Sequence, residues 1–212
     1  MTFAMYEADI YYMPMIEIQK SRGYCMGQCV TWMLDILENK VRYLKPPEDL
    51  KRGKKYHQAF SSMFEHFPAA QGSANLYALK SIAYSAQKPS SGSAASGYIK
   101  SKIAGDHAGA ERLMRDMSLA KGQNSFLLMI VSTPLSAHAI VFFREKSDMY
   151  FMYDPNEGVY KYSGGPLHLY YEIRNYMVRT LGPSYSGCQV NQALLLTTEC
   201  DLKINSRLDS GC

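Results

Sequence analysis

Long hydrophobic runs are missing from this sequence. The longest uninterrupted apolar stretch covers residues 126–131, which suits a strand and falls far short of the roughly 18 residues that a membrane-spanning helix requires. The amino terminus carries the acidic residues Glu7 and Asp9 and lacks the basic start and apolar run of a secretory signal. We therefore expect a soluble protein, which if exported uses a route without a cleaved signal peptide.

A strong bias of charge is also missing. The net charge is +4, charged residues make up 20% of the 212 residues and apolar residues 47%, values that exclude a disordered or fibrous chain. One basic stretch stands out at residues 40–55, where seven Lys or Arg face two acidic residues. This stretch is typical of a solvated surface, and contact with an anionic membrane surface is the alternative. No RNA-binding motif accompanies it, so we expect no nucleic-acid partner.

The cysteines lack the pattern of a disulfide framework. There are five, at positions 25, 29, 188, 200 and 212, an odd number without regular spacing, so at least one thiol stays free in a monomer. Cys25 and Cys29 lie four residues apart in a helical pattern, where their Cβ vectors run nearly parallel and disfavour a mutual disulfide. No second pair of Cys or His completes a metal site with them. We expect a reduced compartment, no metal and no cofactor.

The pattern of apolar residues predicts helices in the first part of the chain and strands in the second. Helices are expected over residues 24–39, 57–66, 74–86, 109–120 and 166–180, and strands over residues 126–132, 138–144, 149–153 and 193–198. Small residues over 88–97 predict a surface loop or a lobe boundary. The predicted fold class is α+β, as a single domain over residues 1–212. Its helical half covers about 1–120 and its antiparallel, β-rich half about 121–212, with a groove between them.

Cys25 is the candidate nucleophile. It falls in the first turn of the predicted helix 24–39, where unpaired backbone N–H groups and the positive end of the helix dipole stabilise a thiolate and, later, an oxyanion. The backbone N–H of Cys25 and the side-chain amide of Gln19, six residues earlier, are candidate oxyanion donors. The alternative for Gln19 is a glutamine of a surface loop. Cys29, one turn further along the same face, is expected in the core.

A candidate base and its partner lie on consecutive predicted strands. His138 opens the strand 138–144, which would hold its backbone rigidly, and Asp154 closes the next strand, sixteen residues later. A hairpin would bring these side chains together, and a carboxylate there would fix the imidazole tautomer and stabilise the imidazolium. The segment at Asp154 also fits a plain β-turn. The other histidines lie in helical patterns, at positions 57, 66 and 168, or in a polar loop, at position 107.

In their order along the chain, these segments resemble a known enzyme family. The segment Gly-Tyr-Cys-Met-Gly-Gln-Cys-Val-Thr-Trp surrounds Cys25, His-Ala followed by apolar residues begins at His138, and an Asp-Pro-Asn turn begins at Asp154. Together they resemble the papain-like cysteine proteases, and more narrowly the YopT/AvrPphB-type (C58) virulence effectors of bacteria. The resemblance covers residues near 19–37 and 136–160. It implies a papain-like domain with the catalytic triad Cys25, His138 and Asp154 and with Gln19 in the oxyanion hole.

The resemblance also implies a function. It points to a thiol hydrolase that is made in the bacterial cytoplasm, secreted without a cleaved signal peptide, and directed at a host protein. The same triad would serve a deamidase, transglutaminase or other acyltransferase, because water or an amine can resolve a thioester intermediate. A third alternative is a catalytically silent effector that binds a protein partner through its 17 Tyr, its 13 Met and the basic stretch 40–55. Hydrolysis of a peptide bond is the preferred hypothesis.

Overall fold

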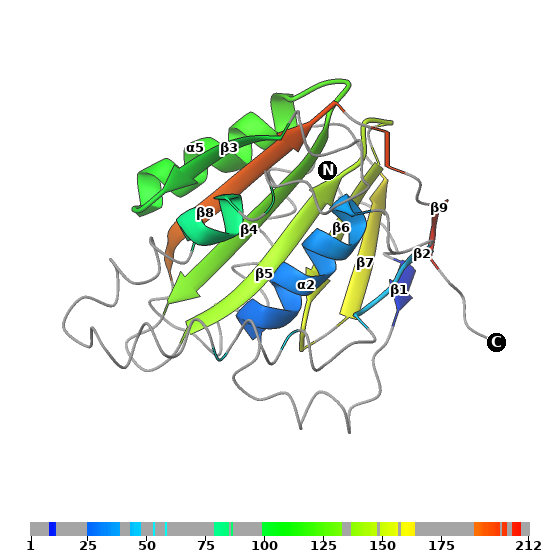
Figure 1. The fold of residues 1–212 in the computed structure, drawn as a ribbon, viewed down its shortest axis with the longest axis horizontal. Coiled ribbons are helices and arrows are strands. Elements are labelled where there is room, and N and C mark those ends of the chain that lie inside the picture. The colour runs from blue at the N-terminus through cyan, green and yellow to red at the C-terminus, as the bar shows by residue number, and fades with distance from the viewer. Residues whose placement is uncertain are drawn as a thin grey trace, which may run out of the picture.

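A seven-stranded antiparallel β-sheet forms the centre of the molecule, with helices on both faces (Figure 1). The computed structural model describes residues 9–11, 25–38, 43–47, 53, 58, 79–84, 86, 99–132, 137–147, 149–156, 158–163, 189–199, 201–202 and 205–208. The strand order is β1-β7-β6-β5-β4-β8-β3. The bounds are Asp9–Tyr11 for β1, Lys100–Ala104 for β3, Asn124–Ser132 for β4, Ala137–Arg144 for β5, Met149–Asp154 for β6, Gly158–Ser163 for β7 and Gln189–Thr198 for β8. A separate parallel pair consists of β2 (Tyr43–Leu44) and β9 (Asn205–Leu208).

The central strands are apolar on both sides because a helix covers each face of the sheet. Along β4, Phe126, Leu128 and Ile130 belong to one buried cluster, and the residues between them belong to a second cluster on the opposite face. A strand that is buried on both faces has a continuous apolar run instead of an alternation. This explains why residues 126–131 form the longest apolar run of the chain.

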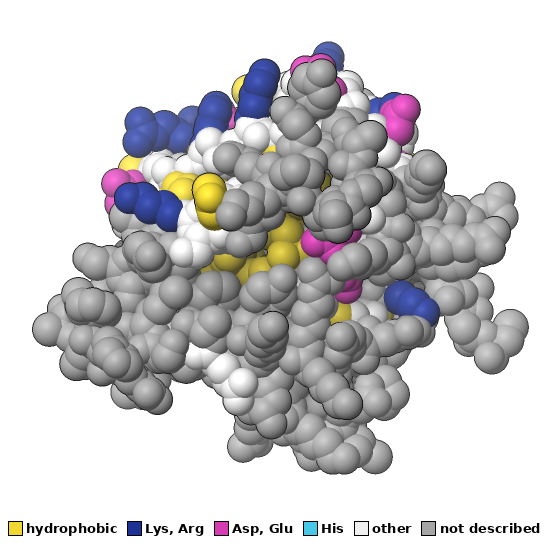
Figure 2. Space-filling view, in the orientation of Figure 1, with side chains coloured by type: hydrophobic (Ala, Val, Ile, Leu, Met, Phe, Trp, Pro, Cys, Tyr) yellow, Lys and Arg dark blue, Asp and Glu magenta, His cyan; other side chains and the backbone are white. Residues whose placement is uncertain are grey.

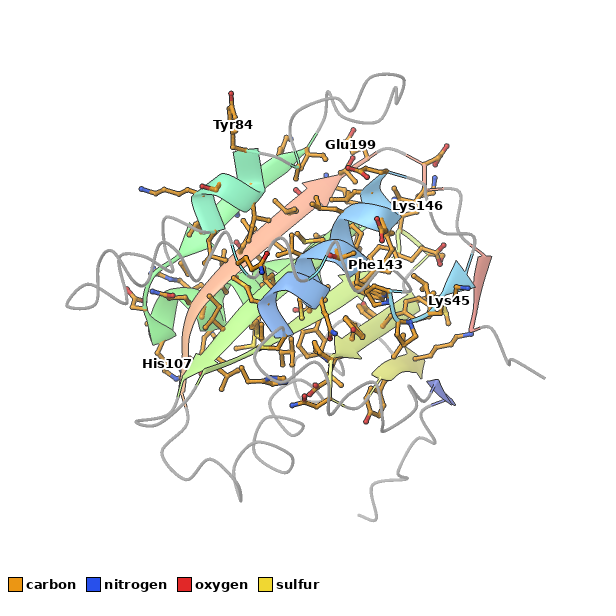
Figure 3. The ribbon with its side chains drawn as sticks, turned by 60° about the horizontal axis from the view of Figure 1, so that its bottom comes forward. Lys45, Tyr84, His107, Phe143, Lys146 and Glu199 are labelled. Carbon is orange, nitrogen blue, oxygen red and sulfur yellow. The ribbon has the colours of Figure 1, made fainter. Side chains whose placement is uncertain are left out.

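Helix α2 (Cys25–Leu37) covers the first face, over β5 and β6 (Figure 1). Its Trp32 meets Phe143 edge-on, with ring centroids 6.4 Å apart, and lies tilted against Tyr153 at 5.5 Å. Figure 3 shows Phe143 beside α2. Helical residues 79–84 add Leu79 and other apolar side chains to the same cluster. These large buried rings fix the place of α2 on the sheet, since cores of this kind are tightly packed.

Helix α5 (His107–Leu119) covers the opposite face. Asp106 caps it, because its carboxylate accepts the N–H of Gly109 at 2.6 Å. Its inward side contributes buried residues such as Met114 and Met117, whereas Arg112 and Arg115 are exposed. Figure 2 shows Lys and Arg side chains gathered along this side of the molecule, over α5 and β3. The helix therefore joins an apolar core to a charged, solvated surface.

The predicted mixture of helices and antiparallel strands is confirmed. The predicted helices 24–39 and 109–120 appear as α2 and α5, and the four predicted strands appear as β4, β5, β6 and β8 with shifted ends. Two longer strands, β3 and β7, were not predicted. The β3 sequence Lys-Ser-Lys-Ile-Ala has few residues that favour strands. It pairs with β8 at the edge of the sheet, where lysine side chains can reach water.

Residue 120 does not separate a helical part from a β part in the described chain. Strands β1 and β3 precede that position, yet they belong to the same sheet as the strands that follow it. Helix α5 packs on this sheet as well. The reason is that both edge positions of the sheet, beside β7 and beside β8, are filled by strands from the first part of the chain.

One histidine lies elsewhere than expected. His107 begins α5 instead of lying in a loop, and its Nδ1 is 3.1 Å from the carbonyl oxygen of Val190. Of the predicted helix 74–86, residues 79–84 and 86 are described, and they are helical. The helices predicted over 57–66 and 166–180 lie outside the described residues, apart from the helical residue 58, as does the loop predicted over 88–97.

Candidate active site

Cys25 is the first residue of α2 and is half-buried. A helix start leaves several backbone N–H groups without an acceptor inside the helix. The N–H groups of Met26, the next residue, and of Ala139, on β5, both form hydrogen bonds with the Cys25 sulfur. The thiol therefore lies where the start of α2 meets the start of β5. Two backbone donors are already directed at it.

His138 and Asp154 form a buried pair at the same end of the sheet. Nε2 of His138 is 2.9 Å from Oδ1 of Asp154, and the two side chains are only 5% and 2% exposed. His138 is the second residue of β5, and Asp154 is the last of β6. The pairing of these strands runs from Arg144↔Tyr150 to Val141↔Tyr153. Asp154 therefore lies one residue, and His138 three residues, beyond the last of these pairs at the same end.

A turn fixes the carboxylate of Asp154. The same Oδ1 that meets His138 accepts the N–H of Asn156 at 2.8 Å, as in an Asx-turn. The hairpin then closes at Gly158, whose φ of 119° lies where residues with side chains rarely go. Pro155 and Asn156 thus form a turn, and Asp154 before them also contacts the imidazole.

His138 also contacts Cys25. A hydrogen bond links the two side chains. Nε2 of the ring is engaged with Asp154. The imidazole therefore interacts with both a thiol and a carboxylate. The structure thus brings together the three side chains that the sequence singled out.

The pKa shifts of the pair are opposite in direction. Burial raises the pKa of the Cys25 thiol, but the hydrogen bond and charge of His138, with the N–H groups of Ala139 and Met26, lower it by more, so the net pKa is lowered. Burial lowers the pKa of His138, but hydrogen bonds with Asp154 and then with Cys25 raise it to about 10. Both directions favour a proton on the imidazole and a negative charge on the sulfur.

Cys29 shows what a thiol in the same helix does without these partners. It is fully buried, and its sulfur donates to the carbonyl oxygen of Ala139 at 3.3 Å. Burial raises the pKa of Cys29, and the nearby charges of Cys25 and Asp154 raise it further. The expected core position of Cys29 is confirmed. This thiol is neutral, whereas the thiol one turn earlier is set up to ionise.

The remaining sequence candidates lie mostly outside the described residues. This is true of Gln19 and of most of the basic stretch 40–55, within which residues 43–47 and 53 are described. The N–H groups of Met26 and Ala139 were not predicted from the sequence. No signal in the sequence marks them, because nearly every residue has such a group and only the packing of α2 on β5 selects these two.

Two kinds of feature are absent from the described part of the chain. No group of three or more His, Cys, Asp or Glu side chains there is arranged to hold a metal ion. No helix there is both long and apolar enough to cross a membrane.

Comparisons with known proteins add a distant structural likeness. No protein-family model matches the sequence, and no curated protein matches it. Among solved structures, the chain is similar to the crystal structure of the Pseudomonas avirulence protein AvrPphB, with 16% identity, a TM-score of 0.47 and coverage of 84% of this chain and 93% of that one. A likeness this distant indicates neither activity nor substrate. The case for a function therefore rests on the residues of the site.

Proposed function

We propose that this protein is a cysteine protease in which Cys25 is the nucleophile, His138 the general acid and base, and Asp154 the residue that orients His138. The observation that carries this proposal is the imidazole of His138, which has Nε2 2.9 Å from Asp154 and also forms a hydrogen bond with Cys25. The lowered pKa of Cys25 and the pKa of about 10 for His138 support a thiolate–imidazolium pair around neutral pH. Such a pair is the reactive form of a catalytic thiol.

The first half of the proposed reaction forms an acyl-enzyme. The Cys25 thiolate attacks the carbonyl carbon of a peptide bond, and the π electrons of that bond move to oxygen. The N–H of Cys25, at the positive end of α2, and the side-chain amide of Gln19 are the proposed donors to this oxyanion. As the oxyanion collapses, the C–N bond breaks and the His138 imidazolium gives its proton to the leaving amine.

The second half releases the product and restores the pair. Neutral His138 takes a proton from water while the water oxygen attacks the thioester carbon. The C–S bond then breaks and returns its electrons to sulfur. The result is a free carboxyl product, a thiolate on Cys25 and a proton on His138. Asp154 keeps its charge throughout and stabilises the imidazolium. No cofactor takes part in these steps.

The biological setting is proposed from the sequence resemblance alone. In this proposal, residues 1–212 form one papain-like domain of the YopT/AvrPphB type, and its substrate is a host protein. The protein is then a virulence effector that leaves the bacterial cytoplasm without a cleaved signal peptide and acts in the host cell.

The activation of the thiol can be tested directly. Wild type, Cys25→Ala and His138→Ala are treated with iodoacetamide between pH 5 and pH 9, and mass spectrometry identifies the modified cysteine. We expect Cys25 to react fastest, well below the ordinary thiol pKa of about 8.5, and His138→Ala to remove this advantage. Reaction at Cys29 with none at Cys25 would contradict the proposal.

Hydrolysis requires a second experiment, because alkylation reports only the nucleophile. Wild type and Cys25→Ala are incubated with a library of peptides from a digested proteome, and new peptide amino termini are identified by mass spectrometry. New termini that depend on Cys25 are the expected result. Conversion of glutamine to glutamate with an intact backbone would instead identify a deamidase. If neither change is found, the protease proposal is without support.

A further inference from the structure

Besides the contacts of Cys25, two buried polar contacts join described residues of α2 to the sheet. In the first, the Cys29 thiol donates to the carbonyl oxygen of Ala139 at 3.3 Å. In the second, the Tyr153 hydroxyl donates to Oε1 of Gln28 at 3.4 Å. Tyr153 and Cys29 are fully buried, Gln28 is 2% exposed, and apolar side chains surround them. Burial of polar groups is unfavourable unless they are bonded, so their presence in this cluster calls for an explanation.

Both contacts reach the sheet within one residue of the proposed catalytic groups. The thiol contact ends at Ala139, the residue after His138, and the hydroxyl contact starts from Tyr153, the residue before Asp154. On the helix side, Gln28 and Cys29 are consecutive residues, about one turn after Cys25. The helix start is thus tied to β5 beside the histidine and to β6 beside the aspartate.

Ala139 lies at the centre of this arrangement. Its carbonyl oxygen accepts the hydrogen bond of Cys29, and its N–H donates to the sulfur of Cys25. Two successive turns of α2 therefore hold the backbone of a single residue. Any movement of the helix along β5 would disturb both contacts, and with them the distance from the Cys25 sulfur to the imidazole.

Apolar packing cannot hold this distance with the same accuracy. The hydrophobic effect depends on buried area and has no direction, whereas a hydrogen bond weakens steeply when its angle or length departs from the optimum. A catalytic pair loses much of its effect when it is displaced by about 1 Å. Directional contacts next to His138 and Asp154 therefore meet a requirement that the aromatic rings around Trp32 do not.

We propose that Cys29 and Tyr153 are positioning residues. Their hydrogen bonds to Ala139 and Gln28 hold α2 at the position along β5 and β6 where Cys25 contacts His138. This inference rests on the proposed function, because it assigns the contacts a role in forming the thiolate–imidazolium pair. The contact of Cys29 has the larger effect, since Ala139 also touches Cys25. The contact of Tyr153 has the smaller one, since 3.4 Å is long for a hydroxyl donor.

The test is the pH dependence of Cys25 alkylation in four variants. Cys29→Ala removes the first contact, Cys29→Ser keeps a donor, Tyr153→Phe removes a single oxygen atom, and Val30→Ala makes a control cavity at a fully buried neighbour on α2. We expect the midpoint of Cys25 alkylation to rise by about half a pH unit in Cys29→Ala and by less in Tyr153→Phe. Cys29→Ser should restore most of the wild-type value, and Val30→Ala should keep it.

Thermal unfolding of the same variants separates positioning from stability. If Cys29→Ala and Val30→Ala both unfold at lower temperature but only Cys29→Ala moves the midpoint, the positioning role is supported. An unchanged midpoint in both Cys29→Ala and Tyr153→Phe, or an equal shift in Val30→Ala, overturns this inference and leaves the proposed function intact. A wild-type midpoint near the ordinary value of about 8.5 overturns both. If Cys29→Ala does not fold, the midpoint of Cys25 alkylation in Tyr153→Phe decides the inference, because this substitution removes only one oxygen atom.

Discussion

Helices α2 and α5 cover opposite faces of one sheet, and each has 13 residues, but their first turns differ. In α5 the carboxylate of Asp106 accepts the N–H of Gly109 and serves as a cap. Neither helix has an acidic residue in its first turn, and in α2 the group that accepts the N–H of Met26 is the ionisable sulfur of Cys25. The positive end of a helix can thus stabilise the fold or stabilise a reactive anion, depending on which group it meets.

The two helices are also held at different ends of β5. The buried polar contacts of α2 lie near its start, at Gln28 and Cys29. The contact of α5 lies near its end, where the fully buried Arg144 donates to the carbonyl oxygen of Met117 at 3.4 Å. Arg144 ends β5 and His138 stands near its beginning, about 20 Å away along an extended chain. The proposed catalytic groups thus lie with α2 at one end of β5, and the contact that supports α5 lies at the other end.

The largest expected effect comes from His138→Ala. Without this effect, the proposed chemistry at the start of α2 would not depend on β5. At pH 6 a thiol of ordinary pKa, about 8.5, is less than about 1% ionised. We therefore expect the rate constant of Cys25 alkylation at pH 6 to fall by roughly ten- to a hundredfold. The measurement is the second-order rate constant with iodoacetamide. A change below about twofold would mean that the start of α2 activates Cys25 without the imidazole.

Asp154→Asn should have the next largest effect. The substitution keeps an oxygen that can accept the N–H of Asn156, but it removes the charge that helps to raise the pKa of His138 to about 10. We expect roughly tenfold slower alkylation of Cys25 at pH 6. Peptide hydrolysis needs the imidazolium as proton donor, so in wild type it should fall as the pH rises through about 10. In the variant this fall should begin about one pH unit lower or more. If hydrolysis falls at the same pH in the variant and in wild type, Asp154 does not raise the pKa of His138.

A smaller effect, on stability alone, is expected at the start of α5. Asp106→Ala removes the cap and should lower the free energy of unfolding by about 1 kcal/mol, as measured by chemical denaturation. Asp106→Asn, which keeps a capping oxygen, is the matched control and should lose less. The pH profile of Cys25 alkylation should not move in either variant. A shifted profile would show that the two faces are coupled through the sheet.

The smallest effect is expected at the exposed ion pair of α5 and β3. Nζ of Lys102 is 2.7 Å from Oδ2 of Asp116, with side chains 64% and 41% exposed. Water and salt screen such pairs, so Lys102→Ala should change the free energy of unfolding by no more than about 0.5 kcal/mol. Denaturation at low and high salt measures the difference. A loss above about 1 kcal/mol would show that β3 depends on this contact to stay on the edge of the sheet.

Much of the fold could be predicted where a segment carries its own pattern. The apolar stripe of α2, the buried run of β4 and the aromatic strand β6 each indicate their conformation within a few residues. The segment Gly-Val-Tyr-Lys-Tyr-Ser of β7 carried a usable signal too, since it alternates and follows the turn at Asp154. The sequence Lys-Ser-Lys-Ile-Ala of β3 did not, because only its pairing with β8 makes it a strand.

The candidate site could be predicted as far as its side chains. Cysteine and histidine are rare enough to single out, with five of each in the chain. The places of Cys25, His138 and Asp154 at a helix start, a strand start and a strand end follow from local patterns. The backbone groups of Ala139 and the hydrogen bonds of Cys29 and Tyr153 could not be predicted, because no residue type marks a backbone group.

The sequence by itself determined the local elements and the chemistry available at their ends. These include a thiol in the first turn of α2, a histidine near the start of β5 and a carboxylate at the end of β6. Each depends on the conformational preferences of neighbouring residues, which act over a few positions. The tertiary structure alone decided which groups meet. The contacts that hold α2 on the sheet join residues 110 and 125 positions apart, and such contacts form only when distant segments pack in one register.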